Sequence, residues 1–128
     1  MKNTYSIQQV TQITGLSTHT LRYYEKIGLL SGIHRNEQGY RLSTEQDLSW
    51  IDFLLRLRET GMPIHGMIRF SELRSLGDAT VTERRQMLEH HEAIIEQQIR
   101  KLRENKRRIR DKIHFYQNLE ERMNEAGL

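Results

Sequence analysis

The first apolar positions of the chain repeat every three residues, as in a helix that buries one face: Ile7, Val10 and Ile13. Ser6 and Gln9 have the spacing of a capping box, so this helix is predicted to begin at Ser6 and to stop at Gly15. A second helix is predicted from the N-cap Ser17 to about Lys26. Two short helices joined by a glycine-containing turn have helix-turn-helix spacing.

Residues 31–42 contain glycine and asparagine between two short segments, which predicts a small β-hairpin, or wing. Polar caps at positions 43–44 begin a third helix that runs to about Thr60 and carries most of the apolar residues of this region, Trp50 and Phe53 among them. Pro63 suits the first turn of a fourth helix, which ends near Leu76. These elements predict a small head with the third helix at its core.

The region from 81 to 123 has neither proline nor glycine, and one apolar column repeats every seven residues. Its members are Leu88, Ile95, Leu102, Ile109, Tyr116 and Met123. A helix of this length is about 60 Å long and cannot bury its apolar column on so small a head. The second column of the seam is largely polar, as at His91 and Asn105. Because the head cannot cover the apolar column, we expect this helix to pair with a second copy in a homodimer.

The predicted fold is all-α with a small β-hairpin wing. A winged helix-turn-helix DNA-binding head covers residues 1–76, a linker covers 77–80, a dimerisation coiled-coil helix covers 81–123 and a tail covers 124–128. No tandem repeat or low-complexity segment interrupts this plan.

Composition limits the classes of function that the chain can have. Apolar residues make up 36% of the chain and charged residues 29%, which disfavours a large enzyme-like core and favours a binding protein. The net charge of +3 is compatible with nucleic-acid binding but too small to establish it. The chain has no cysteine, so it has no disulfide or zinc-thiolate site. No pattern typical of a catalytic or cofactor site is present, and we expect no enzyme activity, no cofactor and no metal. The absence of a signal segment and of a bilayer-spanning run predicts a cytoplasmic protein with no membrane partner.

The second predicted helix carries the candidate DNA contacts. Short polar side chains fill its N-terminal half, the end that enters the major groove in such motifs: Ser17, Thr18, His19 and Thr20. Arg22 and Tyr23 follow one turn later, where they suit a base edge or a phosphate. Taken alone, an Arg-Tyr-Tyr run indicates a surface charge beside core aromatics, and Tyr24 fits an inward position as well as a DNA contact. The wing residues Arg35, Tyr40 and Arg41 make DNA the better interpretation.

Residues 15–30 resemble the signature of the MerR family of bacterial transcription regulators. Gly39-Tyr40-Arg41 is similar to that family's wing, and Arg58 with residues 61–63 to its second wing. The resemblance extends over essentially the whole chain. It implies a two-fold dimer with antiparallel long helices that bends and untwists promoter DNA for RNA polymerase, with Arg22, Tyr23, Tyr40, Arg41 and Arg58 on the backbone or the bases. Leu42 departs from the tyrosine that the family often has at this position.

Within the family, residues 50–53 and 77–84 are similar to the small aldehyde-responsive branch. That branch is associated with a reactive cysteine in the third helix, and this chain has Arg56 there. A thiol-based sensor is therefore excluded. A small-molecule effector is compatible with the fold, although no residue pattern identifies one.

Two alternatives stay open. One is a helical adaptor that binds a protein partner through its coiled coil. The other concerns a basic cluster in the long helix, which would serve either as a nucleic-acid patch or as an ordinary solvated surface. It encircles the helix and includes Glu104 and Asp111, which favours the solvated surface. The basic members are Arg100, Lys101, Arg103, Lys106, Arg107, Arg108, Arg110 and Lys112.

Overall fold

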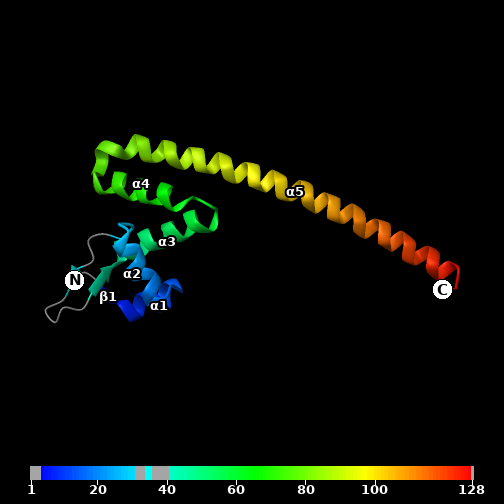
Figure 1. Ribbon diagram of the computed structural model, residues 1–128, viewed down its shortest axis with the longest axis horizontal. Coiled ribbons are helices and arrows are strands. Elements are labelled where there is room, and N and C mark those ends of the chain that lie inside the picture. The colour runs from blue at the N-terminus through cyan, green and yellow to red at the C-terminus, as the bar shows by residue number, and fades with distance from the viewer. Residues whose placement is uncertain (1–3, 31–33, 36–40, 128) are drawn as a thin grey trace. The chain divides into compact units, whose positions relative to one another are not determined.

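The computed structural model describes residues 4–30, 34–35 and 41–127, with side chains for 4–30 and 44–127. It divides into two compact units, Met1–Leu88 and Glu89–Leu128. The short helices and strands all belong to the first unit, and the second consists of most of one long helix (Figure 1). In chain order the elements are β1 (Thr4–Ser6), α1 (Ile7–Thr14), α2 (Thr18–Lys26), β2 (His34–Arg35), β3 (Arg41–Thr44), α3 (Glu45–Glu59), α4 (Ile64–Ser75), the 3-10 helix η1 (Gly77–Thr80) and α5 (Val81–Glu125).

Local capping explains where α1 and α3 begin. The Ser6 hydroxyl accepts from the Gln9 amide at 3.2 Å, and the Gln9 side chain accepts from the Ser6 amide at 2.9 Å. Thr44 and Asp47 form the same reciprocal pair at the start of α3. Both capping boxes confirm the sequence predictions, as does the left-handed Gly15 that ends α1 with a φ of 75°. Pro63 lies one position before α4, as its N-cap.

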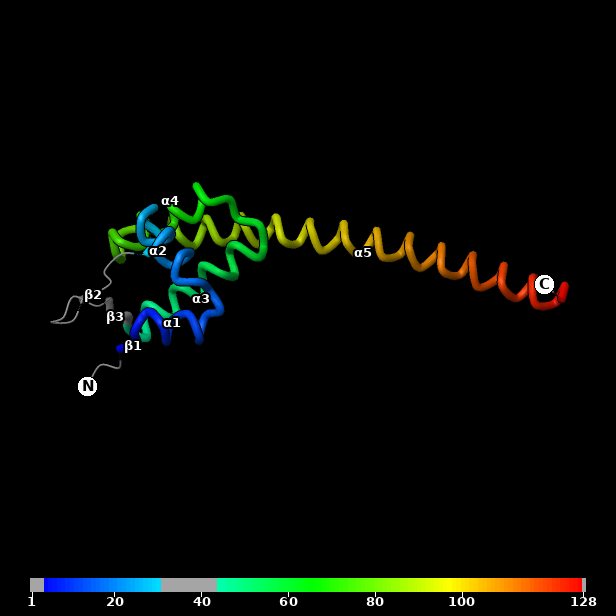
Figure 2. Tube along the Cα trace, turned by 60° about the horizontal axis from the view of Figure 1, so that its bottom comes forward, coloured from blue at the N-terminus to red at the C-terminus, as the bar shows by residue number. Residues whose placement is uncertain are grey.

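The described strands form one antiparallel sheet in the order β1-β3-β2. The predicted hairpin is present, with His34 opposite Leu42 and Arg35 opposite Arg41. Strand β1 is an addition: Tyr5 pairs with Ser43, and its hydroxyl donates to the Glu45 carboxylate at 3.2 Å, which raises the pKa of Tyr5. In Figure 2, β1 continues directly into α1, and α1 packs against α3. Three residues are too few to show strand periodicity, so β1 escaped the sequence analysis.

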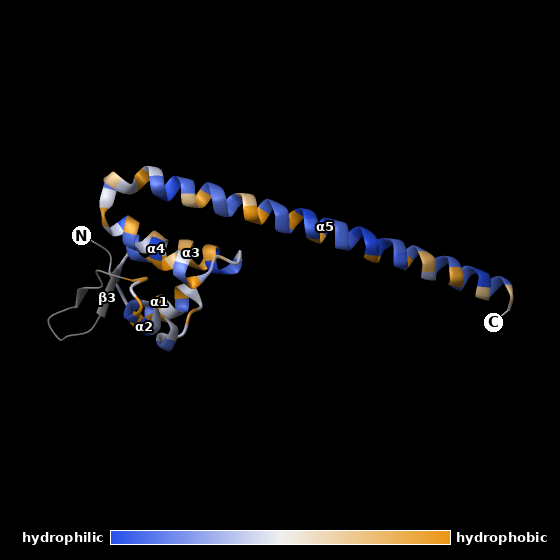
Figure 3. Cartoon of the chain, turned by 45° about the horizontal axis from the view of Figure 1, so that its top comes forward, coloured by the Kyte–Doolittle hydropathy of each residue, from blue (hydrophilic) through white to orange (hydrophobic). Residues whose placement is uncertain are grey.

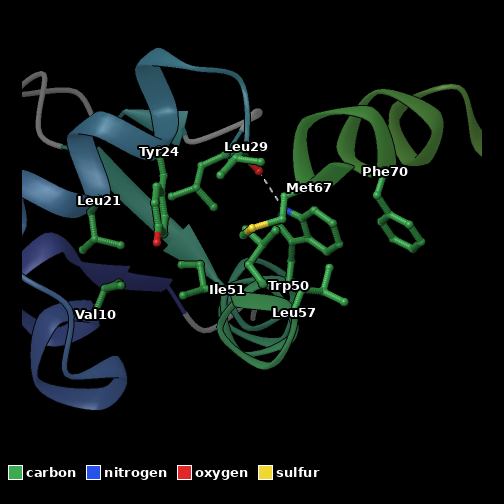
Figure 4. Packing of buried hydrophobic residues seen from close by; sticks show 11 residues of the cluster. Val10, Leu21, Tyr24, Leu29, Trp50, Ile51, Leu57, Met67 and Phe70 are labelled. Carbon is green, nitrogen blue, oxygen red and sulfur yellow. Dashed lines mark hydrogen bonds between the residues drawn. The ribbon is translucent and has the colours of Figure 1, made fainter. Parts of the chain in front are cut away.

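The core of the first unit lies between α1, α2, α3 and α4, and Figure 4 shows its side chains. Leu29, Ile51 and Leu54 have at most 2% of their surface exposed. The Trp50 ring stacks on Phe70 at a centroid distance of 5.8 Å, and its Nε1 donates to the Leu29 carbonyl at 2.7 Å. Trp50 and Phe53 are therefore core residues, as predicted.

The segment predicted as a linker, 77–80, forms the 3-10 helix η1. Thr80 is buried there, and its hydroxyl donates to the Leu73 carbonyl. Arg84 donates to the Gly77 carbonyl at 3.0 Å. These bonds satisfy backbone groups that a helix end would leave open. The first turns of α5 also belong to the head, because Leu88, assigned by its heptad position to the dimer seam, packs against the head's own core.

The second unit is helical from Glu89 to Glu125. Every described side chain from Arg100 onward is exposed, including the apolar column of Leu102 (68%), Ile109 (63%), Tyr116 (53%) and Met123 (42%). Figure 3 shows a mostly hydrophilic α5 with hydrophobic positions scattered along it. No helix in the described part of the chain has the length and apolar character needed to cross a membrane.

Candidate nucleic-acid interface

Helix α2 separates its residues cleanly into two faces. Leu21 and Tyr24, three positions apart, are each only 5% exposed and belong to the core. The opposite face presents His19, Arg22 and Tyr23, all exposed. Lys26 continues this outer face one turn beyond Arg22. The sequence analysis missed Lys26, although its spacing of four from Arg22 was a readable signal.

The N-terminus of α2 is closed by its own side chains. The Ser17 hydroxyl accepts from the Thr20 amide at 3.1 Å and donates to the Thr20 hydroxyl at 3.0 Å. Thr18 is partly buried and His19 is exposed. Of the four short polar residues predicted to contact DNA, Ser17 and Thr20 thus take part in the cap, and Ser17 and His19 are the two that are exposed. Amides at the start of a helix also favour a phosphate.

Tyr24 connects α2 to the end of α3. Its buried ring ends in a hydroxyl that accepts from Arg58 Nη1 at 3.0 Å, whereas Arg58 itself is exposed. The contact spans 34 residues of sequence and so arises only from tertiary packing. Figure 4 shows Tyr24 pointing from α2 into the core, so its ring contributes to packing. The exposed cation at its hydroxyl is Arg58.

A surface pocket of about 380 Å³ lies between α2 and the turn that joins α3 to α4. It combines hydroxyls, one guanidinium and apolar side chains. Its lining residues are Thr20, Tyr23, Tyr24, Arg58, Met62, Ile64 and Met67. Gly61, with a φ of 89°, makes the turn that presents this edge. The pocket can accept an anionic group beside an apolar one, as a sugar-phosphate backbone provides.

In the wing, the structure describes the backbone of strands β2 and β3. Arg35 and Arg41 are paired across β2 and β3, and their side chains lie outside the described residues. Tyr40 also lies outside them. Roles for these three residues therefore stay predictions.

Arg56, at the position of the branch's cysteine, is an exposed charged residue. It contacts Asp52 at 3.2 Å and Glu59 at 2.8 Å. The hydrogen bond that Arg56 donates to the Asp52 carboxylate and the negative charge of Glu59 raise the pKa of Arg56. Among the side chains that the structure describes, those of residues 4–30 and 44–127, no three His, Asp or Glu are grouped so as to hold a metal ion.

Tyr24→Phe tests the link between Tyr24 and Arg58. Loss of the hydroxyl is expected to lower the free energy of unfolding by about 0.5–1.5 kcal/mol, at the lower end because the freed Arg58 can be hydrated. Urea unfolding measures this change. Tyr23→Phe is the matched control, because the Tyr23 hydroxyl makes no hydrogen bond within the described chain. Equal losses in the two variants would contradict the assigned hydrogen bond.

Two family models and several bacterial proteins are similar to this chain. The family model "MerR HTH family regulatory protein" matches residues 5–72, and "MerR, DNA binding" matches residues 48–112. A Haemophilus influenzae protein named as an uncharacterized HTH-type transcriptional regulator is 36% identical over 114 residues, covering 89% of this chain and 84% of its own length. The Bacillus subtilis HTH-type transcriptional regulator AdhR is 39% identical over 83 residues, which are 65% of this chain and 59% of AdhR.

Solved structures agree with these matches. HiNmlR, described as a MerR family regulator lacking the sensor domain and bound to promoter DNA, superposes with a TM-score of 0.83 at 35% identity, covering 91% of this chain and 92% of its own. A Listeria monocytogenes protein described as a "putative MerR family transcriptional regulator" also gives a TM-score of 0.83, at 34% identity, covering 88% of this chain and 85% of its own.

Proposed function

The chain belongs to the MerR family and is a DNA-binding transcriptional regulator, and from this premise we propose that it binds promoter DNA as a homodimer with one α2 in each half-site. The observation that carries the proposal is the outer face of α2, where His19, Arg22 and Tyr23 lie exposed while Leu21 and Tyr24 anchor the helix in the core. A recognition helix needs this division, because its inner face must be rigid while its outer face reads the groove.

Each site residue has a proposed role. Arg22 makes paired hydrogen bonds to a base edge or binds a phosphate. Tyr23 and Arg58 bind the sugar-phosphate backbone at the two edges of the pocket described above. The polar N-terminal residues of α2 and the wing side chains complete the contact with backbone and bases: Ser17, Thr18, His19, Thr20, Arg35, Tyr40 and Arg41.

The exposed apolar column of α5 supports the homodimer. Leu102, Ile109 and Tyr116 are each more than half exposed in the single chain. A helix does not keep such a column in water when a second copy can cover it, and a heptad spacing suits a coiled coil. Antiparallel pairing is what the family resemblance implies.

A promoter-bound dimer of this kind can act on the DNA itself. We propose that its two heads and wings bend and untwist the promoter, so that RNA polymerase engages elements otherwise out of phase. Such deformation costs on the order of a few kcal/mol, which phosphate contacts on both sides of the site can supply. The solved relative HiNmlR, bound to promoter DNA, supports the DNA partner. The site of action follows as the cytoplasm, where a bacterial promoter lies.

Arg22→Ala tests the proposed role of α2. The variant is expected to weaken specific binding by about 1–3 kcal/mol, because Arg22 is assigned to a base edge or a phosphate of the operator. The measurement is fluorescence anisotropy on an operator duplex obtained by selection from genomic DNA.

Arg56→Ala removes the same charge from an ion-paired surface position and is the control. Operator affinity that is equal in Arg22→Ala and wild type contradicts the role of Arg22. A selection that yields no preferred DNA at all would instead favour the helical adaptor.

A further inference from the structure

The middle of α5 is strongly basic. Residues 100–112 contain eight basic and two acidic side chains, all of them exposed. The eight basic side chains together surround the helix, but four of the arginines share one face. Arg100, Arg103, Arg107 and Arg110 are spaced by three, four and three residues, which brings them to one face over about 15 Å of helix. We call this row the arginine stripe.

The donors of the arginine stripe are largely unused. Within the described part of the chain, Arg107 contacts Glu104 at 3.1 Å, and the other three arginines make no ion pair. Glu104 also lies 3.7 Å from Arg108, so it is shared with a residue off the stripe. An exposed pair of this kind holds its partners weakly. Like charges three and four residues apart destabilise a helix, and an anionic partner would offset that cost.

The stripe lies apart from the apolar column of α5. Leu102 and Ile109 follow the seven-residue seam, about 80° or more around the helix from the nearest stripe position. Ile99 borders the stripe on the side that faces the seam, and the positions on its other side are polar: Gln97, Glu104 and Asp111. The stripe therefore belongs neither to a coiled-coil seam nor to a protein interface of the usual kind, which has an apolar or aromatic centre.

The chemistry of the stripe favours phosphate. Guanidinium groups bind phosphate oxygens in a paired geometry that ammonium groups do not reproduce, and all four stripe residues are arginines. We propose that the arginine stripe binds the phosphate backbone of double-stranded DNA outside the segment that α2 reads. A head already bound to its operator would raise the local concentration of that flanking DNA. The contact is independent of sequence and adds to the regulator's affinity and to its salt dependence.

The test removes the stripe and compares it with an equal loss of charge. One full-length variant carries R100Q, R103Q, R107Q and R110Q. Its matched control carries K101Q, K106Q, R108Q and K112Q, which removes four positive charges from the same turns but from other faces. Glutamine preserves helix propensity, and circular dichroism with size-exclusion chromatography verifies folding and assembly of both variants.

The readout is the slope of log affinity against log salt concentration for a long random-sequence duplex. The stripe variant is expected to lose about 3–4 from the magnitude of the slope, since each phosphate contact contributes nearly one, with affinity about tenfold lower or more at low salt. The control is expected to lose about one or less. Equal changes in the two variants assign the effect to net charge and overturn the proposal, as does an unchanged slope in both. A third outcome also overturns the proposal: the stripe variant alone loses binding to polyglutamate, while its salt slope on DNA is unchanged. That result would indicate an acidic protein partner.

Arg22→Ala separates this proposal from the function of α2. In that background the preference for the operator falls, while the difference in slope between the stripe variant and its control is expected to persist on random DNA. If the difference disappears with Arg22, the stripe is not an independent contact.

Discussion

Trp50→Ala is expected to lower the free energy of unfolding of the head by about 3–5 kcal/mol, the usual cost of deleting a large aromatic side chain from a core. The indole is 7% exposed and stacks on Phe70 with an interplanar angle of 14°. Its Nε1 donates to the Leu29 carbonyl, and the Arg74 guanidinium lies 4.4 Å from the ring centroid. The substitution therefore removes packing, a buried hydrogen bond and a cation–π contact together.

The hydrogen bond also ties α3 to the chain that leaves α2. Ser71 of α4 donates to the neighbouring Gly28 carbonyl at 3.0 Å, so two helices hold the exit of the recognition helix. Trp50→Ala leaves the Leu29 carbonyl without its best donor, although Ser71 lies within 3.5 Å of it. We expect weaker operator binding in addition to lower stability, because α2 loses part of its support.

Urea unfolding followed by circular dichroism measures the change in Trp50→Ala. Trp50→Phe is the control, since it keeps an aromatic ring beside Phe70 but loses the Nε1 donor, and its loss is expected to be well below that of alanine. A Trp50→Ala protein that is as stable as wild type would contradict the packing described here.

The double variant L102E and I109E is expected to convert the protein from dimer to monomer. Each side chain is more than 60% exposed in the single chain, and covering a large aliphatic side chain contributes about 1.5–3 kcal/mol. A dimer buries both positions twice, and a carboxylate in an apolar seam must lose water without gaining a partner. The loss is large compared with the free energy of a marginal coiled coil.

Sedimentation velocity measures the oligomeric state, and anisotropy measures operator binding, which is expected to fall about a hundredfold or more because one head then holds one half-site. The control Q97E and N118E adds the same two charges outside the apolar column. A double variant that sediments as the wild-type dimer would remove α5 from the dimer interface.

Local signals in the sequence predicted most of the helices correctly. The capping boxes at Ser6 and Thr44 and the left-handed glycine at position 15 act over a few residues, and the heptad column repeats along one helix. Each can therefore be identified without the fold. The same is true of the helix-turn-helix spacing, which the structure reproduces as α1 and α2. The 3-10 helix η1 within the segment assigned as a linker was not predicted, because the Thr80 bonds that hold it arise from the path of the chain after α4.

Tyr23 and Tyr24 show what local sequence signals cannot predict. They are adjacent and chemically identical, yet Tyr23 is 49% exposed and Tyr24 is 5% exposed with its hydroxyl held by Arg58. Leu88 shows the same effect, since it shares a column with Ile109 but packs on the head. Local periodicity indicates a face of a helix and does not say what covers it.

Local sequence signals were enough to predict the order of the helices, the ends of most of them and the family, because caps, turns and charged side chains are local properties. Tertiary packing set which residues of α2 point outward. That choice depends on α3 and α4 packing against one side of α2, through contacts such as Tyr24 with Arg58 and Trp50 with Leu29 that join residues more than twenty positions apart.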